Sequence, residues 1–457
     1  MPVAGCTPAL DHDAVATPGA PSPAHAAPES LVACHECDFV QQHVHVPPGS
    51  TVRCSRCNSV IYRNPDKTFD HAIAWSLTGL ILLVLANVFP VLHLSVSGHH
   101  TDTTLVSGAV ALYRGGQPGV AALVVGVLIL APALIFLLQI GVLLPLRYGW
   151  LPRGFDVSMR LMTRLGHWIM FDVFMLAVIV AVVKLSSLAE VTPGPGLWAF
   201  LVLMIASTMS VVSYDHHVLW ERYSELLGDR YVPPVLHGSR GCGSAMANGL
   251  VACGECGLVS AWRPDANGLS HCPRCASVLH RRKTDSLNRT WALLLAGYVL
   301  FIPANVLPIT ITSSIVGVQS DTIMSGVAYF WHEGAYDLAI IIFTASIFVP
   351  LAKLLALTVL AWSAQTRSTW DPMQRTRLYR MVEFVGKWSM LDVFVVAMLA
   401  RLVQFSSLAS IEAGPGAIAF SAVVVITMFA AMSFDPRLMW DPLENGRHSG
   451  EERDSSR

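Results

Sequence analysis

Charged residues are scarce in this chain. Only 13% of its 457 residues are Asp, Glu, Lys or Arg, against about 25% in a typical soluble protein, whereas 53% are hydrophobic. The formal net charge is -1, so the chain lacks the basic excess that is typical of a nucleic-acid-binding protein. This composition argues against a soluble domain and predicts a protein with several membrane-spanning helices.

Several functional motifs are also missing. No G-x-x-x-x-G-K-[ST] phosphate loop occurs, and no Ser/His/Asp or Cys/His arrangement stands out. We therefore predict neither a P-loop ATPase nor any other enzyme. Residues 1–30 are rich in proline and alanine and lack the basic start and apolar core of a secretory signal peptide. We expect this segment to be a disordered cytosolic tail.

Eight of the ten cysteines fall into two sets of four. Each set contains two CxxC pairs, with sixteen residues between the pairs in the first set and fifteen in the second: Cys34, Cys37, Cys54 and Cys57, then Cys253, Cys256, Cys272 and Cys275. Two CxxC pairs on short hairpins hold four thiolates tetrahedrally, which predicts two zinc ribbons with one Zn²⁺ each.

Two other interpretations of these cysteines stay open. Disulfides are disfavoured in a reducing cytosol. A rubredoxin-like iron site uses the same four-thiolate ligand set as zinc and would carry electrons. In either metal site the four thiolates complete the coordination, so the nearby histidines are interpreted as surface residues: His35, His43, His45 and His271.

One long stretch occurs twice in the chain. Residues 166–200 and 386–420 share a tryptophan, an aspartate, the sequence SSLA and a Gly-Pro-Gly turn between two apolar runs. The aspartates are Asp172 and Asp392, and similar matches run through the whole chain at an offset of 218 to 220 residues. This duplication predicts two copies of one membrane module.

Four candidate spans follow each set of cysteines: 72–94, 119–146, 165–185 and 197–213, then 291–312, 338–362, 388–408 and 417–434. The predicted fold class is an all-α polytopic membrane protein with two tandem four-helix transmembrane domains, each preceded by a small cytosolic zinc ribbon. The predicted boundaries are a disordered tail (1–30), ribbon 1 (31–64), transmembrane domain 1 (70–220), a linker (221–249), ribbon 2 (250–283), transmembrane domain 2 (288–440) and a disordered tail (441–457).

Basic residues indicate the orientation. An even number of spans in each module makes the repeats parallel, so both ribbons are expected on one face. The loops after the second spans are basic: Arg147, Arg153, Arg160 and Arg164, then Arg367, Arg375, Arg377, Arg380 and Lys387. By the positive-inside rule, the ribbons and both termini face the cytoplasm. The loops 93–118 and 313–337 then face the periplasm.

Two asparagine–proline motifs lie within the predicted first spans. Asn87 precedes Pro90, and Asn305 precedes Pro308, by three residues. Because proline cannot donate a hydrogen bond to the carbonyl one turn back, we expect both spans to kink there. The kinks either pack passively against neighbouring helices or open a cavity or lateral gate, and both interpretations stand.

Charged and polar residues at membrane depth are concentrated in the second half. They are Lys353, Asp392, Arg401 and Gln404, whereas the first half keeps mainly Asp172, Lys184 and Gln139. Charges within a membrane are costly and mark functional sites, so we hypothesise a Lys353–Asp392 pair that lines a transport cleft. The alternative is a static ion pair that only fixes packing.

This set of motifs resembles the paraquat-inducible protein A family over about residues 31–440. The resemblance rests on the CxxC ribbons, the NVxP and W-x3-DVF motifs, the Gly-Pro-Gly turn and their repetition. It implies an inner-membrane protein of a Gram-negative bacterium that works with a periplasm-spanning partner of the mammalian-cell-entry (MCE) type. It also implies a phospholipid cargo, and it carries the metal ligands over to the eight cysteines.

Three functions are therefore considered. The first is the inner-membrane subunit of an intermembrane lipid transport system, which passes lipid to or from the MCE-domain partner. The second is a membrane redox protein with four-thiolate iron centres. The third is a scaffold that anchors the partner without transporting anything.

Overall fold

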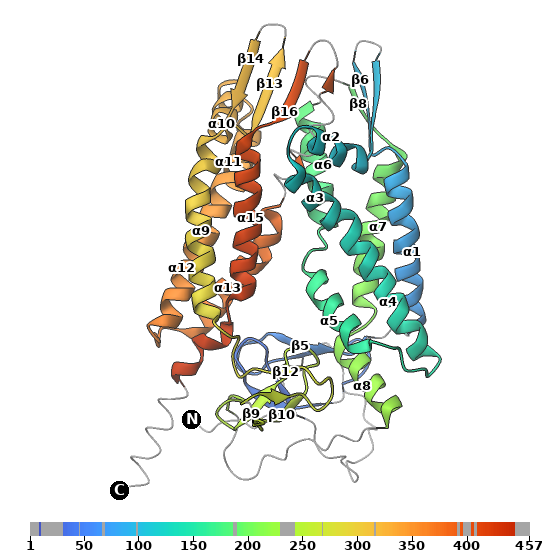
Figure 1. Cartoon of the computed structure of the whole chain (residues 1–457), viewed down its shortest axis with the longest axis vertical. Helices are drawn as coiled ribbons and strands as arrows, with labels where there is room; N and C mark the ends of the chain where they lie inside the picture. Colours follow the sequence, from blue (N-terminus) through green and yellow to red (C-terminus); the bar gives the residue numbers. More distant parts are fainter. Residues whose placement is uncertain are drawn as a thin grey trace.

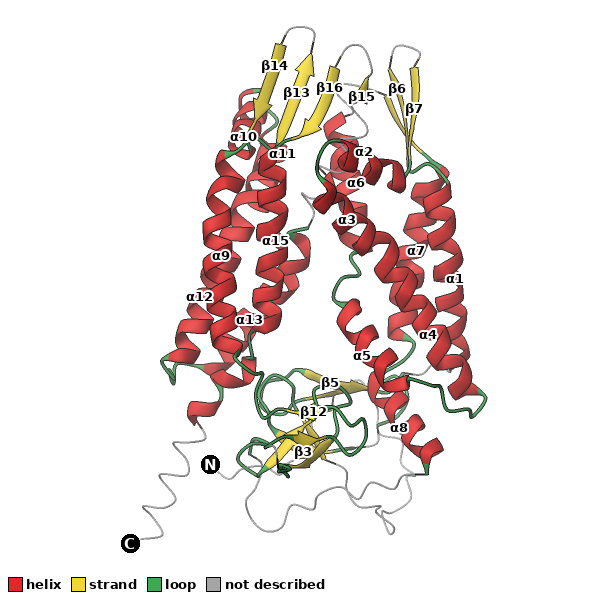
Figure 2. Ribbon diagram, in the orientation of Figure 1, coloured by secondary structure: helices red, strands yellow, loops and turns green. Residues whose placement is uncertain are grey.

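The computed structural model describes most of the chain (Figure 1). The described residues are 9–10, 31–44, 46–65, 69–96, 99–185, 190–228, 243–266, 268–314, 317–390, 394–395, 404–405 and 409–443. They form two helical bundles that stand side by side (Figure 2). Small hairpins lie at one end of the bundles, and extended strands project from the other end (Figure 2). We call these the ribbon end and the strand end.

The first bundle contains long apolar helices, which satisfy their own backbone hydrogen bonds and need no water to do so. Its helices are α1 (Phe69–Val88), α3 (Pro118–Val125), α4 (Ala131–Arg147), α5 (Phe155–Gly166), α6 (Phe171–Leu185) and α7 (Pro195–Val212). Helix α1 packs lengthwise against α7 and α4. All of these helices except α5, which ends where the predicted span 165–185 begins, overlap the predicted spans of the first half.

The second bundle repeats this arrangement with the later part of the chain. Its helices are α9 (Ser286–Val306), α11 (Tyr336–Phe343), α12 (Val349–Gln365), α13 (Pro372–Trp388) and α15 (Pro415–Ser433). Helix α9 packs against α15 and α12, as α1 packs against α7 and α4. Across the described residues, seven helical segments are long and apolar enough to cross a membrane. The predicted span 388–408 lies largely outside the described residues.

The longest helical segment of each bundle contains a wide turn of π-helix. In the first bundle this turn is Gly126–Leu130, between α3 and α4, and in the second it is Thr344–Phe348, between α11 and α12. Each turn is followed by a proline, Pro132 or Pro350, in the first turn of the next α-helix. Since a proline ring clashes with the carbonyl one turn back, the wider turn lets the helix continue through it.

The predicted kinks at the asparagine–proline motifs are wrong. Helix α1 ends at Val88 and α9 ends at Val306, so Pro90 and Pro308 lie beyond the last helical residue. The residue before a proline favours extended backbone, and Leu307 adopts φ −78° and ψ 149°. The prolines therefore end these helices and do not bend them.

Strands form in segments that the sequence analysis expected to be loops or the ends of spans. In the first half the sheet has the order β7-β6-β8, formed by β6 (Leu92–Val96), β7 (His99–Thr103) and β8 (Glu190–Pro193). In the second half the order is β14-β13-β16-β15, formed by β13 (Thr310–Ser314), β14 (Gly317–Asp321), β15 (Gln404–Phe405) and β16 (Ala409–Ala413). Every strand pair is antiparallel. Both sheets lie at the strand end (Figure 2).

A short capped helix follows the first hairpin of each sheet. These helices are α2 (Leu105–Arg114) and α10 (Ile323–His332). Thr104 and Thr322 begin them with capping boxes, in which the threonine hydroxyl accepts from the N–H of a serine three residues on. The same cap in both halves leads the chain back toward the second span.

The ribbon end consists of two-stranded hairpins, as the cysteine spacing predicts. The first ribbon has β2 (Leu31–Ala33), β3 (Val40–Gln42), β4 (Thr51–Arg53) and β5 (Val60–Arg63), and the second has β9 (Leu250–Ala252), β10 (Val259–Ala261), β11 (Ser270–His271) and β12 (Val278–Leu279). Within the N-terminal tail, expected to be disordered, β1 (Ala9–Leu10) pairs with β4. The remainder of that tail and residues 444–457 lie outside the described residues.

Candidate functional site

The first candidate site is the four-cysteine cluster of each ribbon. All eight thiols are buried and none forms a disulfide. The closest sulfur pairs are 3.5 to 3.6 Å apart: Cys34–Cys57, Cys37–Cys54, Cys253–Cys275 and Cys256–Cys272. A tetrahedral ion with metal–sulfur bonds of about 2.3 Å spaces its sulfurs by about 3.8 Å, so each cluster fits a metal after a small expansion.

The backbone after each CxxC pair explains why these short segments form such clusters. The residue after the second cysteine adopts a left-handed φ of 53° to 71° in all four hairpins: Asp38, Asn58, Gly257 and Ala276. Its N–H donates to the carbonyl of the first cysteine, over 2.9 to 3.0 Å. Each pair is thus closed into a tight turn that directs both thiols inward.

Hydroxyl groups and neighbouring thiols support the sulfurs. Ser59 Oγ lies 2.9 Å from Cys34 Sγ, and Ser277 Oγ lies 3.0 Å from Cys275 Sγ. Hydrogen bonds between the thiols of each cluster lower the pKa values of Cys57 and Cys253 far below the ordinary thiol range and raise those of Cys37 and Cys256 well above it. Each cluster thus shares its protons unequally, and a bound cation would favour the thiolate form of all four sulfurs. The geometry suits zinc and iron alike.

Each ribbon packs under the bundle that it does not precede. The cysteines of ribbon 1 share a core with Leu360, Tyr379 and Trp440 of the second half. The cysteines of ribbon 2 share a core with Phe155 and Trp220 of the first half. The two ribbons also contact one another, since Leu31 and Val40 of ribbon 1 share a core with Leu250 and Val259 of ribbon 2.

Two arginines at corresponding positions of the repeats hold each ribbon against the bundle that it does not precede, an arrangement that we call the crossed packing of the ribbons. Arg380 of α13 forms a two-pronged pair with Glu36, and its Nη2 donates to the Cys57 carbonyl over 2.9 Å. Arg160 of α5 donates to the Cys275 carbonyl over 3.2 Å. In the sequence these arginines served only as markers of orientation. The structure places them against the last cysteine of each cluster.

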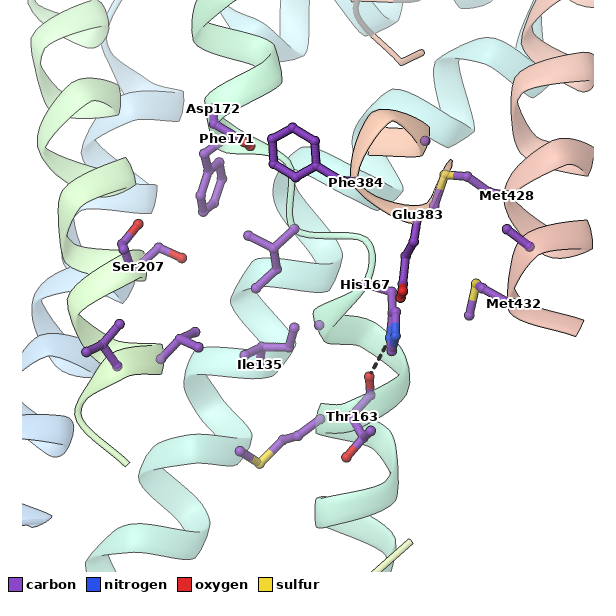
Figure 3. Close-up of a pocket in the computed structure, with 18 of the residues that line it drawn as sticks. Ile135, Thr163, His167, Phe171, Asp172, Ser207, Glu383, Phe384, Met428 and Met432 are labelled. Carbon is purple, nitrogen blue, oxygen red and sulfur yellow. Dashed lines mark hydrogen bonds between the residues drawn. The ribbon is translucent and has the colours of Figure 1, made fainter. Parts of the chain in front are cut away.

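The second candidate site is a cavity of about 940 Å³ between the two bundles. Its walls come from α4, α5, α6 and α7 on one side and from α12, α13 and α15 on the other. Figure 3 shows Phe171 and Ile135 of the first bundle on one side, with Phe384, Met428 and Met432 of the second bundle on the other. A mainly apolar lining with a few polar groups is typical of a site for an apolar ligand.

The polar groups of this cavity differ between the two bundles. Lys353 lines it from α12, with 3% of the residue exposed, and no described residue forms a hydrogen bond with its Nζ. The corresponding residue of the first half is Ile135, which lines the cavity as well. Asp172 contributes an exposed carboxylate at the start of α6. The cavity is thus asymmetric in charge although the bundles are related.

A buried hydrogen-bond network borders the cavity in the first bundle, and the sequence analysis did not find it. Ser76 and Ser210 both donate to Gln139 Oε1 over 2.9 Å, and Gln139 Nε2 donates to Tyr214 Oη over 2.8 Å. The counterparts of the first three residues in the second half form an apolar core: Leu294, Leu357 and Ala430. Comparing the repeats position by position would have revealed this difference.

The predicted polar network is only partly visible. Asp392 and Arg401 lie outside the described residues, so the Lys353–Asp392 pair stays a prediction. Gln404 was expected at membrane depth, but it lies in β15, paired with Ser410 of the sheet at the strand end. The expectation failed because the chain is already extended there and no longer in an apolar helix.

The asparagine–proline motifs have a structural partner in the Gly-Pro-Gly turns. Gly414 N–H donates to the Ile309 carbonyl over 2.6 Å, and Gly416 N–H donates to the Pro308 carbonyl over 2.9 Å. The first half repeats this contact between Gly196 and Pro90. In both halves the end of the first span is therefore joined to the start of the last span by the two repeated motifs.

Replacing Gly414 with alanine is expected to destabilise the second bundle. A Cβ there would lie 2.3 Å from the Pro308 carbonyl oxygen, which is backbone and cannot rotate away. We expect a loss of about 1–3 kcal/mol, the usual cost of overpacking, measured by thermal unfolding in detergent. Gly141→Ala is the control, since no atom lies within 4 Å of its added Cβ. Equal melting temperatures for the two variants would contradict this contact.

The fold and these sites define a multi-pass membrane protein with two buried four-cysteine clusters. The family model for paraquat-inducible protein A matches residues 69–224 and 287–444. The chain therefore belongs to the paraquat-inducible protein A family, as the motifs indicated.

Similar curated proteins cover nearly the whole chain. The intermembrane transport protein PqiA of Escherichia coli (strain K12) is 32% identical over 93% of this chain and 98% of its own length. The lipophilic envelope-spanning tunnel protein A of the same strain is 30% identical over 90% of this chain and 92% of its own. A probable intermembrane transport protein of Haemophilus influenzae is 28% identical, with 90% and 96% covered. No solved structure matches the chain.

Proposed function

We propose that this chain is the inner-membrane subunit of an intermembrane lipid transport system. In this proposal it passes phospholipid between the inner membrane and a periplasmic MCE-domain partner. The cavity between the bundles carries the proposal, because it combines about 940 Å³ of mainly apolar space with a buried amine. Relatives named for intermembrane transport and for a tunnel across the envelope support it.

The proposed orientation places the ribbon end in the cytoplasm and the strand end in the periplasm. The basic residues near the ribbons support this direction, by the positive-inside rule. Each repeat then has four spans, with the eighth between α13 and β15. The sheets β7-β6-β8 and β14-β13-β16-β15 face the periplasm and offer the surface on which the partner docks.

In this arrangement the ribbons are structural and each holds one Zn²⁺. The four thiolates of a ribbon leave no open coordination position for a substrate. Their contacts with Arg160 and Arg380 support a role in joining the two bundles beneath the cavity. The cavity residues Lys353 and Asp172, with Asp392 and Arg401, form the proposed polar path for the lipid headgroup.

Filling the cavity tests this function. Ser207 lines it from α7 and is 5% exposed, so Ser207→Trp places an indole inside. We expect transfer of a radiolabelled phospholipid from proteoliposomes to the partner to fall at least about tenfold, which corresponds to a loss of about 1.4 kcal/mol. Ile205→Trp is the control, because Ile205 is an exposed residue of the same helix outside the cavity lining. Unchanged transfer in Ser207→Trp, with the variant folded, would refute the proposal.

A further inference from the structure

We propose that His43, His217 and Glu221 form a third metal site, which binds Zn²⁺ and joins ribbon 1 to α8 (His216–Leu227). One ligand atom from each of the three side chains lies within 4.8 Å of the others. The site contains no cysteine and is separate from both thiolate clusters. It lies where α8 follows the last helix of the first bundle and contacts ribbon 1.

The three side chains converge on one point. His43 Nε2 lies 3.9 Å from Glu221 Oε1, and His217 Nδ1 lies 3.4 Å from the same oxygen. His217 and Glu221 are four residues apart on α8, which places them on one face of the helix. The side chain of His43 is only 6% exposed, so its interpretation as a surface residue was wrong.

Neighbouring groups hold this arrangement in place. The rings of His43, Tyr62 and His217 stack on one another, with centroids 4.8 to 5.4 Å apart. Asp215 caps α8 by accepting from His217 N–H over 2.8 Å, and it accepts from Arg63 N–H of ribbon 1 over 2.9 Å. The backbones of ribbon 1 and α8 are therefore already fixed beside each other, which lowers the entropy cost of binding an ion.

The chemistry of the ligands favours zinc. Two imidazoles and one carboxylate are a known zinc ligand set that leaves a fourth position for water. The rings of His43 and His217 are almost parallel, with 10° between their planes. In parallel stacked rings the nitrogen lone pairs lie in separate planes, so zinc binding requires one ring to leave the stack by rotation about its broad χ2 torsion.

The duplication shows why the site belongs to the first half alone. The counterpart of His217 is Arg437, which cannot bind a cation. Arg437 pairs with Asp435, over 3.0 Å, and approaches Asp38 of ribbon 1 to 3.9 Å. Ribbon 1 is thus held by a fixed cation in the second half. In the first half the proposed Zn²⁺ takes that role.

Zinc titration of the purified full chain tests the site. With both thiolate clusters already loaded, isothermal titration calorimetry with ZnCl₂ is expected to show one further ion per chain. His217→Ala and Glu221→Gln are each expected to weaken the affinity for this third ion at least ~10-fold. Even residues that only hydrogen-bond to a metal ligand change metal affinity by that factor when they are replaced. Hydrogen exchange in α8 is expected to slow when this zinc binds to the unmodified chain, and not when ZnCl₂ is added to His217→Ala or Glu221→Gln.

Two matched controls separate the site from ordinary surface binding. Glu225→Gln changes a carboxylate one turn further along α8 that pairs with Arg222, and His271→Ala removes a half-exposed histidine near Asp265 on ribbon 2. Neither is expected to change the third step. The proposal is overturned if no third ion binds, or if His271→Ala weakens binding as much as His217→Ala, which would mean an adventitious ion only.

Discussion

Replacing Cys57 with serine is expected to remove one metal ion per chain and to unfold ribbon 1. The ribbon has only a small apolar core of its own, formed by Val32, Val46, Val52 and Tyr62, and its cysteines are buried against residues of the second half. A structural zinc site contributes about 10–16 kcal/mol to the folding of such a segment, so the loss of one thiolate is not compensated by packing. Metal analysis and limited proteolysis of the purified protein measure both effects.

The effect of Cys57→Ser on the bundles tests the crossed packing of the ribbons, in which ribbon 1 lies under the second bundle. Because ribbon 1 contacts Arg380 and Trp440, we expect faster hydrogen exchange in α13 of the second bundle and little change in α5 of the first. Cys242→Ser is the control, since Cys242 belongs to neither set of four. Full metal content in Cys57→Ser would contradict the metal site. Faster hydrogen exchange confined to the first bundle would contradict the packing of ribbon 1 under the second bundle.

Metal content also separates the lipid transporter from the redox alternative. We expect the purified protein to be colourless, with about two zinc ions in its thiolate sites. Two iron ions with a visible absorption band would instead favour electron transfer.

Replacing Lys353 with methionine is expected to stop lipid transfer while leaving the protein folded and more stable. The lysine is 3% exposed, and no described residue forms a hydrogen bond with its amine, so within the described residues no partner holds its charge in a static pair. Replacing buried charges with apolar residues of similar volume is often neutral or stabilising, by up to about 4 kcal/mol. The expected loss of transfer is at least about tenfold.

The repeated bundle supplies the control for this prediction. Ile135→Met changes the corresponding position of the first half, which lines the same cavity but carries no charge. Transfer and thermal stability are measured for both variants in the same proteoliposomes. If Lys353→Met unfolds the protein, or if it transfers lipid as well as Ile135→Met, the lysine serves packing alone.

Local chemistry explains what the sequence could predict. The thiolate clusters follow from ligand type and spacing within about twenty-five residues, and the backbone turn after each CxxC pair needs only neighbouring residues. The apolar helices follow from the length of the hydrophobic runs. A proline, by contrast, either bends or ends a helix, and Pro90 and Pro308 lie just beyond helix ends, where their carbonyls accept hydrogen bonds from the distant Gly-Pro-Gly turns.

Features that depend on distant segments were missed. The strands after Pro90 and Pro308 each pair with the next strand in a hairpin and with a third strand about one hundred positions away, and the sequence carries no signal for the third strand. The crossed packing of the ribbons depends on the ion pair between Arg380 and Glu36, which are 344 residues apart. His43 and His217 meet only after both ribbon and bundle have folded. Each of these is a tertiary contact without a local signal.

The account depends most on the cavity between the bundles as the place where lipid is held. Its most direct test is a cryo-electron microscopy map of the chain in lipid nanodiscs, in complex with its partner. We expect elongated lipid density inside the cavity, with its headgroup beside Lys353 and its chains against Phe384 and Met432. A cavity closed by side chains and free of such density, in a complex that still transfers lipid, would contradict the account.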